Sequence, residues 1–208
     1  MPLYKTLRPN SQTIVKIWWI TESFEELREE LELLPDTLER AEGMKSELHQ
    51  KGFLSVRRLL KEFGYTDSDL YYDENGKPHL RDGKYISISH SYIYSAIIVG
   101  EQPVGIDIEK QRQKIKLISS KFCGPERKFF NPESEKYIRQ LTVIWCIKES
   151  LYKLYAKPGL SFKENTLVIP AMLEDGETDA WILYGTDRKK YKFNFLEFDG
   201  FTCAFTVS

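Results

Sequence analysis

VGIDIEK, at residues 104–110, is the stretch that decides how the rest of the chain is read. Its apolar residues alternate with small or acidic ones, which predicts a β-strand whose two faces differ. The apolar residues would face a core, and Gly105, Asp107 and Glu109 would face the other way. Two carboxylates beside a residue with no side chain suit a hard divalent cation and leave room for a phosphate. The pattern is equally typical of a strand with a solvated outer face.

A second acidic motif lies further along the chain, in WCIKESLYK at residues 145–153. It belongs to the longest helical pattern of the sequence, about residues 134–156. Glu149 and Lys153 are four residues apart and would share a helix face, with Trp145 one turn earlier. This pattern is typical of a surface Glu–Lys pair. Within a site it would add a third carboxylate and an ammonium group for phosphate oxygens.

Two weaker motifs precede the acidic strand. SISHS, at residues 87–91, places His90 among serines at a strand end, where imidazole and hydroxyl groups could bind phosphate or simply stabilise a turn. GKP, at residues 76–78, follows an Asn-Gly turn signal and is typical of a hairpin loop. The sequence contains no GxSxG, P-loop or GxGxxG motif, so covalent catalysis is not indicated.

The order of elements predicts an α+β fold made of two lobes, residues 1–104 and 105–208. In the first lobe we expect a strand at 14–20, a capping box that starts a helix at Ser23, and helical structure over about 36–63. Gly43 and Gly52 are candidate breaks in that helical region. The second lobe should end in an antiparallel meander, with strands near 166–170, 180–184, 190–197 and 201–207.

Composition excludes several classes of protein. The 208 residues are 41% hydrophobic, and 30 Lys+Arg balance 31 Asp+Glu to a net charge of −1, which argues against disorder and against a polybasic nucleic-acid module. Three widely spaced cysteines without a CxxC motif favour a reducing, cytoplasmic setting. No apolar run approaches the ~20 residues of a membrane span, and no secretory signal is visible.

Together, GKP, SISHS, VGIDIEK and WCIKESLYK resemble, in this order and spacing, the motifs of the 4′-phosphopantetheinyl transferase superfamily. FCGPERKFF, which contains Glu126, is similar to the family's segment between the last two motifs. The resemblance covers about residues 50–165. Two tandem halves resemble the broad-specificity, two-lobed type that activates peptide synthetases and the carriers of fatty acid biosynthesis.

The resemblance implies a pseudosymmetric fold with coenzyme A and Mg²⁺ bound in a cleft between the lobes. Such an enzyme moves the 4′-phosphopantetheine arm of coenzyme A onto a serine of an acyl or peptidyl carrier protein and releases adenosine 3′,5′-bisphosphate. By the same resemblance, Asp107, Glu109 and Glu149 would hold Mg²⁺. Lys148 and Lys153 would contact the diphosphate, and the nucleotide portion would be contacted by Lys77, Ser89 and His90.

The resemblance leaves some roles open. Catalysis would fall to Glu149 and Lys153, with Glu149 the first choice as the base that deprotonates the carrier serine. Glu126 and Glu109 are the alternatives for that base. One departure is His49, which stands where relatives often have an arginine for the 3′-phosphate of the nucleotide.

The expected partner is an acidic carrier protein, docking on the basic residues between Lys110 and Lys128. We expect a monomer that binds neither nucleic acid nor membranes. Two other functions stay open: a relative that binds carrier proteins without catalysis, and a magnesium-dependent phosphoesterase or nuclease that uses Asp107 and Glu109.

Overall fold

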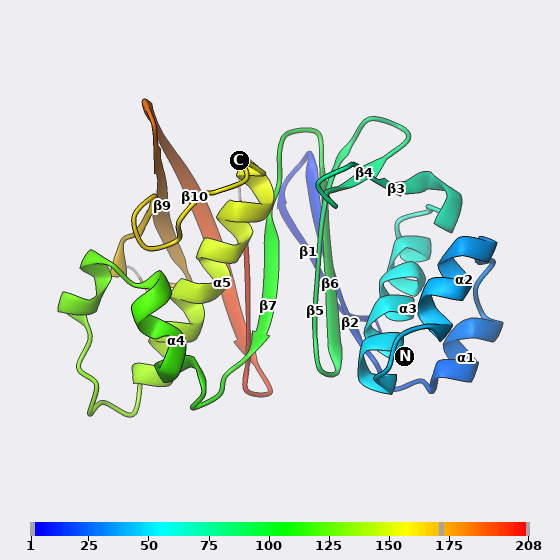
Figure 1. Cartoon of the computed structure of the whole chain (residues 1–208), viewed down its shortest axis with the longest axis horizontal. Coiled ribbons are helices and arrows are strands. Elements are labelled where there is room, and N and C mark those ends of the chain that lie inside the picture. The colour runs from blue at the N-terminus through cyan, green and yellow to red at the C-terminus, as the bar shows by residue number, and fades with distance from the viewer. Residues whose placement is uncertain (1–2, 171–172, 207–208) are drawn as a thin grey trace. The chain divides into compact units, whose positions relative to one another are not determined.

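The computed structural model describes residues 3–170 and 173–206 (Figure 1). The chain divides into two compact units, Met1–Pro103 and Val104–Ser208. This division falls one residue before the lobe boundary expected from the sequence. Both units combine helices with antiparallel strands, as the α+β expectation requires.

The first unit is built on a sheet with the strand order β1-β2-β6-β5. Its strands are β1 (Leu3–Asn10), β2 (Thr13–Trp19), β5 (Tyr85–Ser91) and β6 (Tyr94–Gly100). Helix α3 (Glu47–Glu62) packs on β2, β5 and β6, and α1 (Phe24–Glu29) and α2 (Pro35–Glu42) pack on α3. The remaining elements are the 3-10 turn η1 (Asp67–Asp69) and the short pair β3 (Leu70–Tyr72) and β4 (Pro78–Leu80).

Local sequence signals explain most of these helix boundaries. The capping box of Ser23 and Glu26 is present and starts α1 as expected. This helix is short and ends at Glu29, and Pro35 is the first residue of α2. Proline suits the first turn of a helix because its missing N–H has no partner to lose there.

The two candidate glycine breaks behave differently. Gly43 ends α2, whereas Gly52 lies buried inside the uninterrupted helix α3. The strand β1 was not expected, because only scattered residues of its sequence LYKTLRPN are apolar. It is the edge strand of its sheet, bonded to β2 alone, and most of it is at least partly exposed. Edge strands need no continuous apolar face, so their sequence signal is weak.

The second unit carries a sheet with the order β7-β11-β10-β9-β8. The expected meander is present as β8 (Thr166–Val168), β9 (Glu177–Tyr184), β10 (Asp187–Phe198) and β11 (Phe201–Thr206), and β7 (Ile106–Lys110) pairs antiparallel with β11. The long helix α5 (Tyr137–Tyr155) packs on β7, β11, β8 and β9. Helix α4 (Ile115–Phe122) packs on α5 and is followed by the 3-10 turn η2 (Pro125–Phe129). Among the described residues, no helix is long and apolar enough to cross a membrane.

Gly105 permits a close approach between β7 and α5. A Cβ atom at this position would lie 2.1 Å from the carbonyl oxygen of Ser150 and 3.1 Å from Cβ of Leu154. Its backbone is fixed by Thr206, whose hydroxyl accepts from the Gly105 N–H at 3.0 Å and whose N–H donates to the Gly105 carbonyl at 3.0 Å. The missing side chain therefore provides contact with the helix, whereas the sequence suggested room for a phosphate.

The substitution Gly105→Ala tests this contact. We expect it to lower the free energy of unfolding by at least about 1–3 kcal/mol, because its methyl group would overlap a backbone carbonyl that cannot rotate away. Urea titration measures the effect. The matched control is Gly43→Ala, where φ is −73° and alanine fits the backbone. Equal stability of both variants would show that β7 and α5 do not pack this closely.

Candidate functional site

Three acidic residues of the second unit, Asp107, Glu109 and Glu149, lie on the two elements β7 and α5, which pack together. Asp107 is buried on β7, and Lys153 of α5 donates from Nζ to its Oδ1 at 2.7 Å and to the Ile106 carbonyl at 3.1 Å. Glu109, two residues further on the same strand, accepts a hydrogen bond from the indole N–H of Trp145 at 3.4 Å. The strand therefore turns its acidic face toward the helix, and both carboxylates meet side chains of WCIKESLYK.

Glu149 belongs to the same group electrostatically. Its pKa rises from 4.5 to about 7, first because burial penalises the charged form and then because Asp107 and Glu109 repel it, while Lys153 opposes the rise. Two neighbouring carboxylates that raise the pKa of a third must lie near it. Glu149 can thus exchange a proton near neutral pH, which the sequence pattern alone could not indicate.

The three carboxylates provide the oxygen donors that a hard divalent cation prefers. Lys153 supplies the positive charge that stands beside Asp107 in this structure. Among residues 3–170 and 173–206, no group of three or more His, Cys, Asp or Glu side chains is arranged to hold a metal ion. The donor chemistry fits magnesium, and the predicted ligand set stays a prediction.

Lys148 occupies a different environment from Lys153. Its side chain is fully buried, and Nζ pairs with Glu126 Oε1 at 2.7 Å and donates to the Phe122 and Phe162 carbonyls at 2.7 and 2.9 Å. Burial lowers its pKa, and Glu126 opposes this change. The expected contact between Lys148 and a diphosphate finds no support in this arrangement, because the ammonium group is surrounded by acceptors of the protein itself.

Glu126 is likewise enclosed and fully buried. Besides Lys148, it accepts from the backbone N–H of Gly124 at 2.8 Å and of Val168 at 3.1 Å. A base must reach the proton that it removes. These contacts give Glu126 a structural role and leave Glu149 and Glu109 as the candidates for the base.

The predicted nucleotide-binding residues lie in the first unit. Ser89 is buried and His90 is exposed, both on β5, and the imidazole of His90 lies over Gly52 of α3. A Cβ atom at Gly52 would be 2.8 Å from Nδ1 of His90, so this glycine makes room for the ring. The glycine itself predicted only a helix break, because nothing in the local sequence indicates that a ring lies over it.

Lys77 lies in the loop between β3 and β4, where its backbone N–H donates to Asp73 Oδ1 at 2.9 Å. Burial lowers the pKa of its ammonium group, and Asp73 opposes this effect. His49 is exposed near the start of α3. These residues share a unit with Ser89 and His90, and their contact with a nucleotide stays a prediction.

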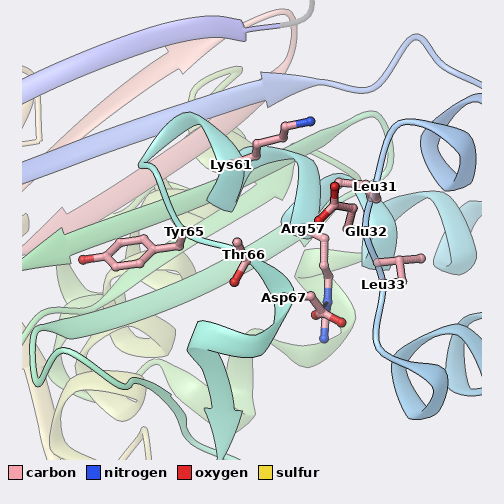
Figure 2. A pocket seen from close by; sticks show the side chains of 8 residues that line it. All are labelled: Leu31, Glu32, Leu33, Arg57, Lys61, Tyr65, Thr66 and Asp67. Carbon is pink, nitrogen blue, oxygen red and sulfur yellow. Dashed lines mark hydrogen bonds and ion pairs between the residues drawn. The ribbon is translucent and has the colours of Figure 1, made fainter.

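Arg57 is buried on α3 and has a structural role. Its guanidinium group bonds the carboxylate of Asp67 at 3.2 Å and lies 3.8 Å from the ring centroid of Phe53. Figure 2 shows Arg57 and Asp67 pointing toward each other. The pocket drawn there is lined by Leu31, Glu32, Leu33, Arg57, Lys61, Tyr65, Thr66 and Asp67. Arg57 therefore forms its ion pair with Asp67 of the same unit.

Comparison with known proteins points to the same half of the chain. Residues 103–206, half of the chain, match the model of the 4′-phosphopantetheinyl transferase superfamily. The chain belongs to the 4′-phosphopantetheinyl transferase superfamily. The matched residues include β7 and α5 and therefore Asp107, Glu109 and Glu149.

Two curated proteins are also similar to this chain. Enterobactin synthase component D of Salmonella typhi is 30% identical over 124 residues, which cover 58% of this chain and 53% of that protein. The protein of the same name from Salmonella typhimurium shows the same identity and coverage. The chain thus spans about half the length of the curated relatives that it matches.

The raised pKa of Glu149 predicts how stability depends on pH in metal-free protein. The folded-state value of about 7 exceeds the ordinary 4.5, so the charged carboxylate costs stability increasingly between these values and fully above pH 7. Glu149→Gln removes that cost. We expect its melting temperature to exceed that of the wild type by several degrees at pH 8, with no gain below pH 4.5.

Thermal unfolding in the presence of a chelator at pH 8 and pH 4.5 makes this comparison. Glu133→Gln is the control, because Glu133 is an exposed residue outside the cluster. A gain for Glu149→Gln that is the same at both pH values would contradict electrostatic crowding of the three carboxylates.

Proposed function

We propose that this protein transfers the 4′-phosphopantetheine arm of coenzyme A to a serine of an apo carrier protein and releases adenosine 3′,5′-bisphosphate. The observation that carries this proposal is the cluster of Asp107, Glu109, Glu149 and Lys153 within the part of the chain that matches the family. Transfer of a phosphoryl-linked group depends mainly on positioning and on stabilising charge, which such a cluster provides.

Asp107, Glu109 and Glu149 would hold a magnesium ion in the working enzyme. Bound magnesium draws negative charge from the diphosphate as the bond to the leaving phosphate breaks. Lys153 is 27% exposed at its side chain and already lies at the cluster, so its ammonium group can turn from Asp107 to diphosphate oxygens. Of the two lysines first considered for this task, only Lys153 retains it.

Glu149 would take the proton from the carrier serine. A base works best when its pKa lies near the operating pH, and the value of about 7 meets this condition in the metal-free site. Glu109 already accepts from Trp145, which leaves its carboxylate less available. As the ion and the proton compete for one carboxylate, Asp107 and Glu109 would supply the tighter ligands.

The nucleotide part of coenzyme A would be bound by Lys77, Ser89 and His90. Their support is the resemblance of GKP and SISHS to the family motifs and the seating of His90 over Gly52. His49 would replace the arginine common in relatives, with weaker attraction for the 3′-phosphate when its imidazole is neutral.

The carrier would dock beside Glu109. A hollow there is lined by Lys110, Arg112, Lys114, Ile115, Ile118, Thr142 and Trp145 together with Glu109. Leu117 on α4 is 77% exposed and Phe129 of η2 is 67% exposed, which adds apolar contact area among basic residues. Exposed basic residues around an apolar contact suit an acidic carrier protein that presents an apolar helix face.

The enzyme would act as a monomer in the cytoplasm, where its buried free thiols Cys123, Cys146 and Cys203 stay reduced. The acceptor is either a fatty-acid carrier or a peptidyl carrier. The curated relatives are named as components of enterobactin synthase, so the carriers tested should include a peptide-synthetase type as well as one from fatty acid biosynthesis.

The direct test mixes the protein with coenzyme A, Mg²⁺ and a panel of apo carriers, and follows carrier mass. We expect a gain of one phosphopantetheine group. Asp107→Asn should lower kcat by about 10²–10³-fold in protein that circular dichroism shows to be folded, because it removes a charge and keeps the shape. Binding of carrier without labelling would indicate a non-catalytic relative, and nucleotide release without labelling would indicate a phosphoesterase.

The docking surface has its own test. Reversing Lys114 and Lys116 to Glu should raise KM for the carrier about tenfold at low salt and leave KM for coenzyme A unchanged, with a smaller effect at high salt. The matched control reverses Lys189 and Lys192, which are exposed on β10. If both double variants raise KM equally, the carrier is attracted by total charge and does not dock on α4.

A further inference from the structure

The ammonium group of Lys148 joins three segments that are separate in sequence. It pairs with Glu126 of η2, and its other acceptors are the carbonyls of Phe122 at the end of α4 and of Phe162 and Thr166 just before or at the start of β8. The distances from Nζ to these carbonyl oxygens are 2.7, 2.9 and 3.3 Å. Lys148 therefore links helix α5 to the end of α4, to η2 and to the segment that leads into β8.

The ion pair is closed to substrate. Lys148 and Glu126 both have fully buried side chains, and both oxygens of Glu126 accept backbone N–H groups in addition to the ion pair. Burying two charges costs desolvation energy, and apolar residues of similar volume are often as stable in such places. A buried ion pair is therefore weak evidence for stability. The other contacts of Lys148, to backbone carbonyls, indicate a second role for this residue.

Those contacts lead to the site through two aromatic rings. The rings of Phe122 and Phe162, whose carbonyls Lys148 binds, both pack on Trp145, with centroid distances of 5.0 and 5.6 Å. The indole N–H of Trp145 in turn donates to Glu109 at 3.4 Å. In a close-packed interior, a shift of either backbone segment moves its ring and so moves the indole.

We propose that Lys148 is a positioning residue for Glu109. It holds the backbones of Phe122 and Phe162, their rings hold Trp145, and the Trp145 indole orients the Glu109 carboxylate. This inference rests on the proposed function for its consequence in catalysis, but the chain of contacts exists without it. It also explains why a lysine is required: one side chain must reach an acid and several carbonyls together, which methionine cannot do and the planar fork of arginine does not match.

The test uses Lys148→Met and, because that change leaves Glu126 buried and unpaired, the double variant Lys148→Met with Glu126→Gln. The ¹H–¹⁵N signal of the Trp145 indole is the first readout, assigned by its loss in Trp145→Phe. We expect the signal to move in both lysine variants and in Glu109→Gln. It should stay in place in Leu27→Ala, which removes core volume on α1 in the separate core of the first unit.

Kinetics supply the second readout. In the double variant we expect kcat to fall about 10–100-fold, as when a residue that orients a ligand is lost, with KM for coenzyme A unchanged. Leu27→Ala should lose activity only in proportion to its unfolded fraction. An unmoved indole signal would overturn the proposal. A rise in KM for coenzyme A with kcat intact would also overturn it, since Lys148 would then contact substrate.

The two readouts separate this inference from the proposed function. Wild-type protein that labels no carrier and releases no nucleotide would refute the transferase proposal. The indole signal would still decide, in the same samples, whether Lys148 positions Trp145 and Glu109.

Discussion

The close packing of α5 on β7 is the constraint on which the candidate site depends. Only a residue without a side chain lets the helix backbone approach the strand at Gly105, where a Cβ atom would overlap the Ser150 carbonyl. Further along the strand, Asp107 accepts a hydrogen bond from Lys153, and Glu109 accepts one from Trp145. The same contact brings Glu149 close enough to both carboxylates for its pKa to rise to about 7.

The two lysines of WCIKESLYK illustrate how burial divides roles between residues of one type. Lys153 is partly exposed and bonds a site carboxylate, so it remains able to meet a phosphate. Lys148 lies five residues earlier, a turn and a half of helix, and therefore points elsewhere. Its partners are Glu126 and backbone carbonyls. We therefore propose the chemical role for Lys153 alone and a positioning role around Trp145 for Lys148.

In the first unit, as at Gly105 in the second, a glycine allows a close contact. Gly52 lies inside α3, where glycine costs helix stability, and its position beneath the His90 ring accounts for that cost. Arg57, one turn further along, is occupied by Asp67 and Phe53. The anion-binding capacity expected of this unit therefore rests on residues at its strands and loops, such as His90, and not on the buried face of α3.

The sequence by itself determined the family, the α+β class, and most strands and helices, because periodicity and motif spacing are local properties of the chain. It could not reveal the edge strand β1, whose pattern is weak because one side needs no partner. It also could not separate Lys148 from Lys153, or Glu126 from Glu149. Burial and ion pairing depend on which distant segments pack together, and only the tertiary structure decides that.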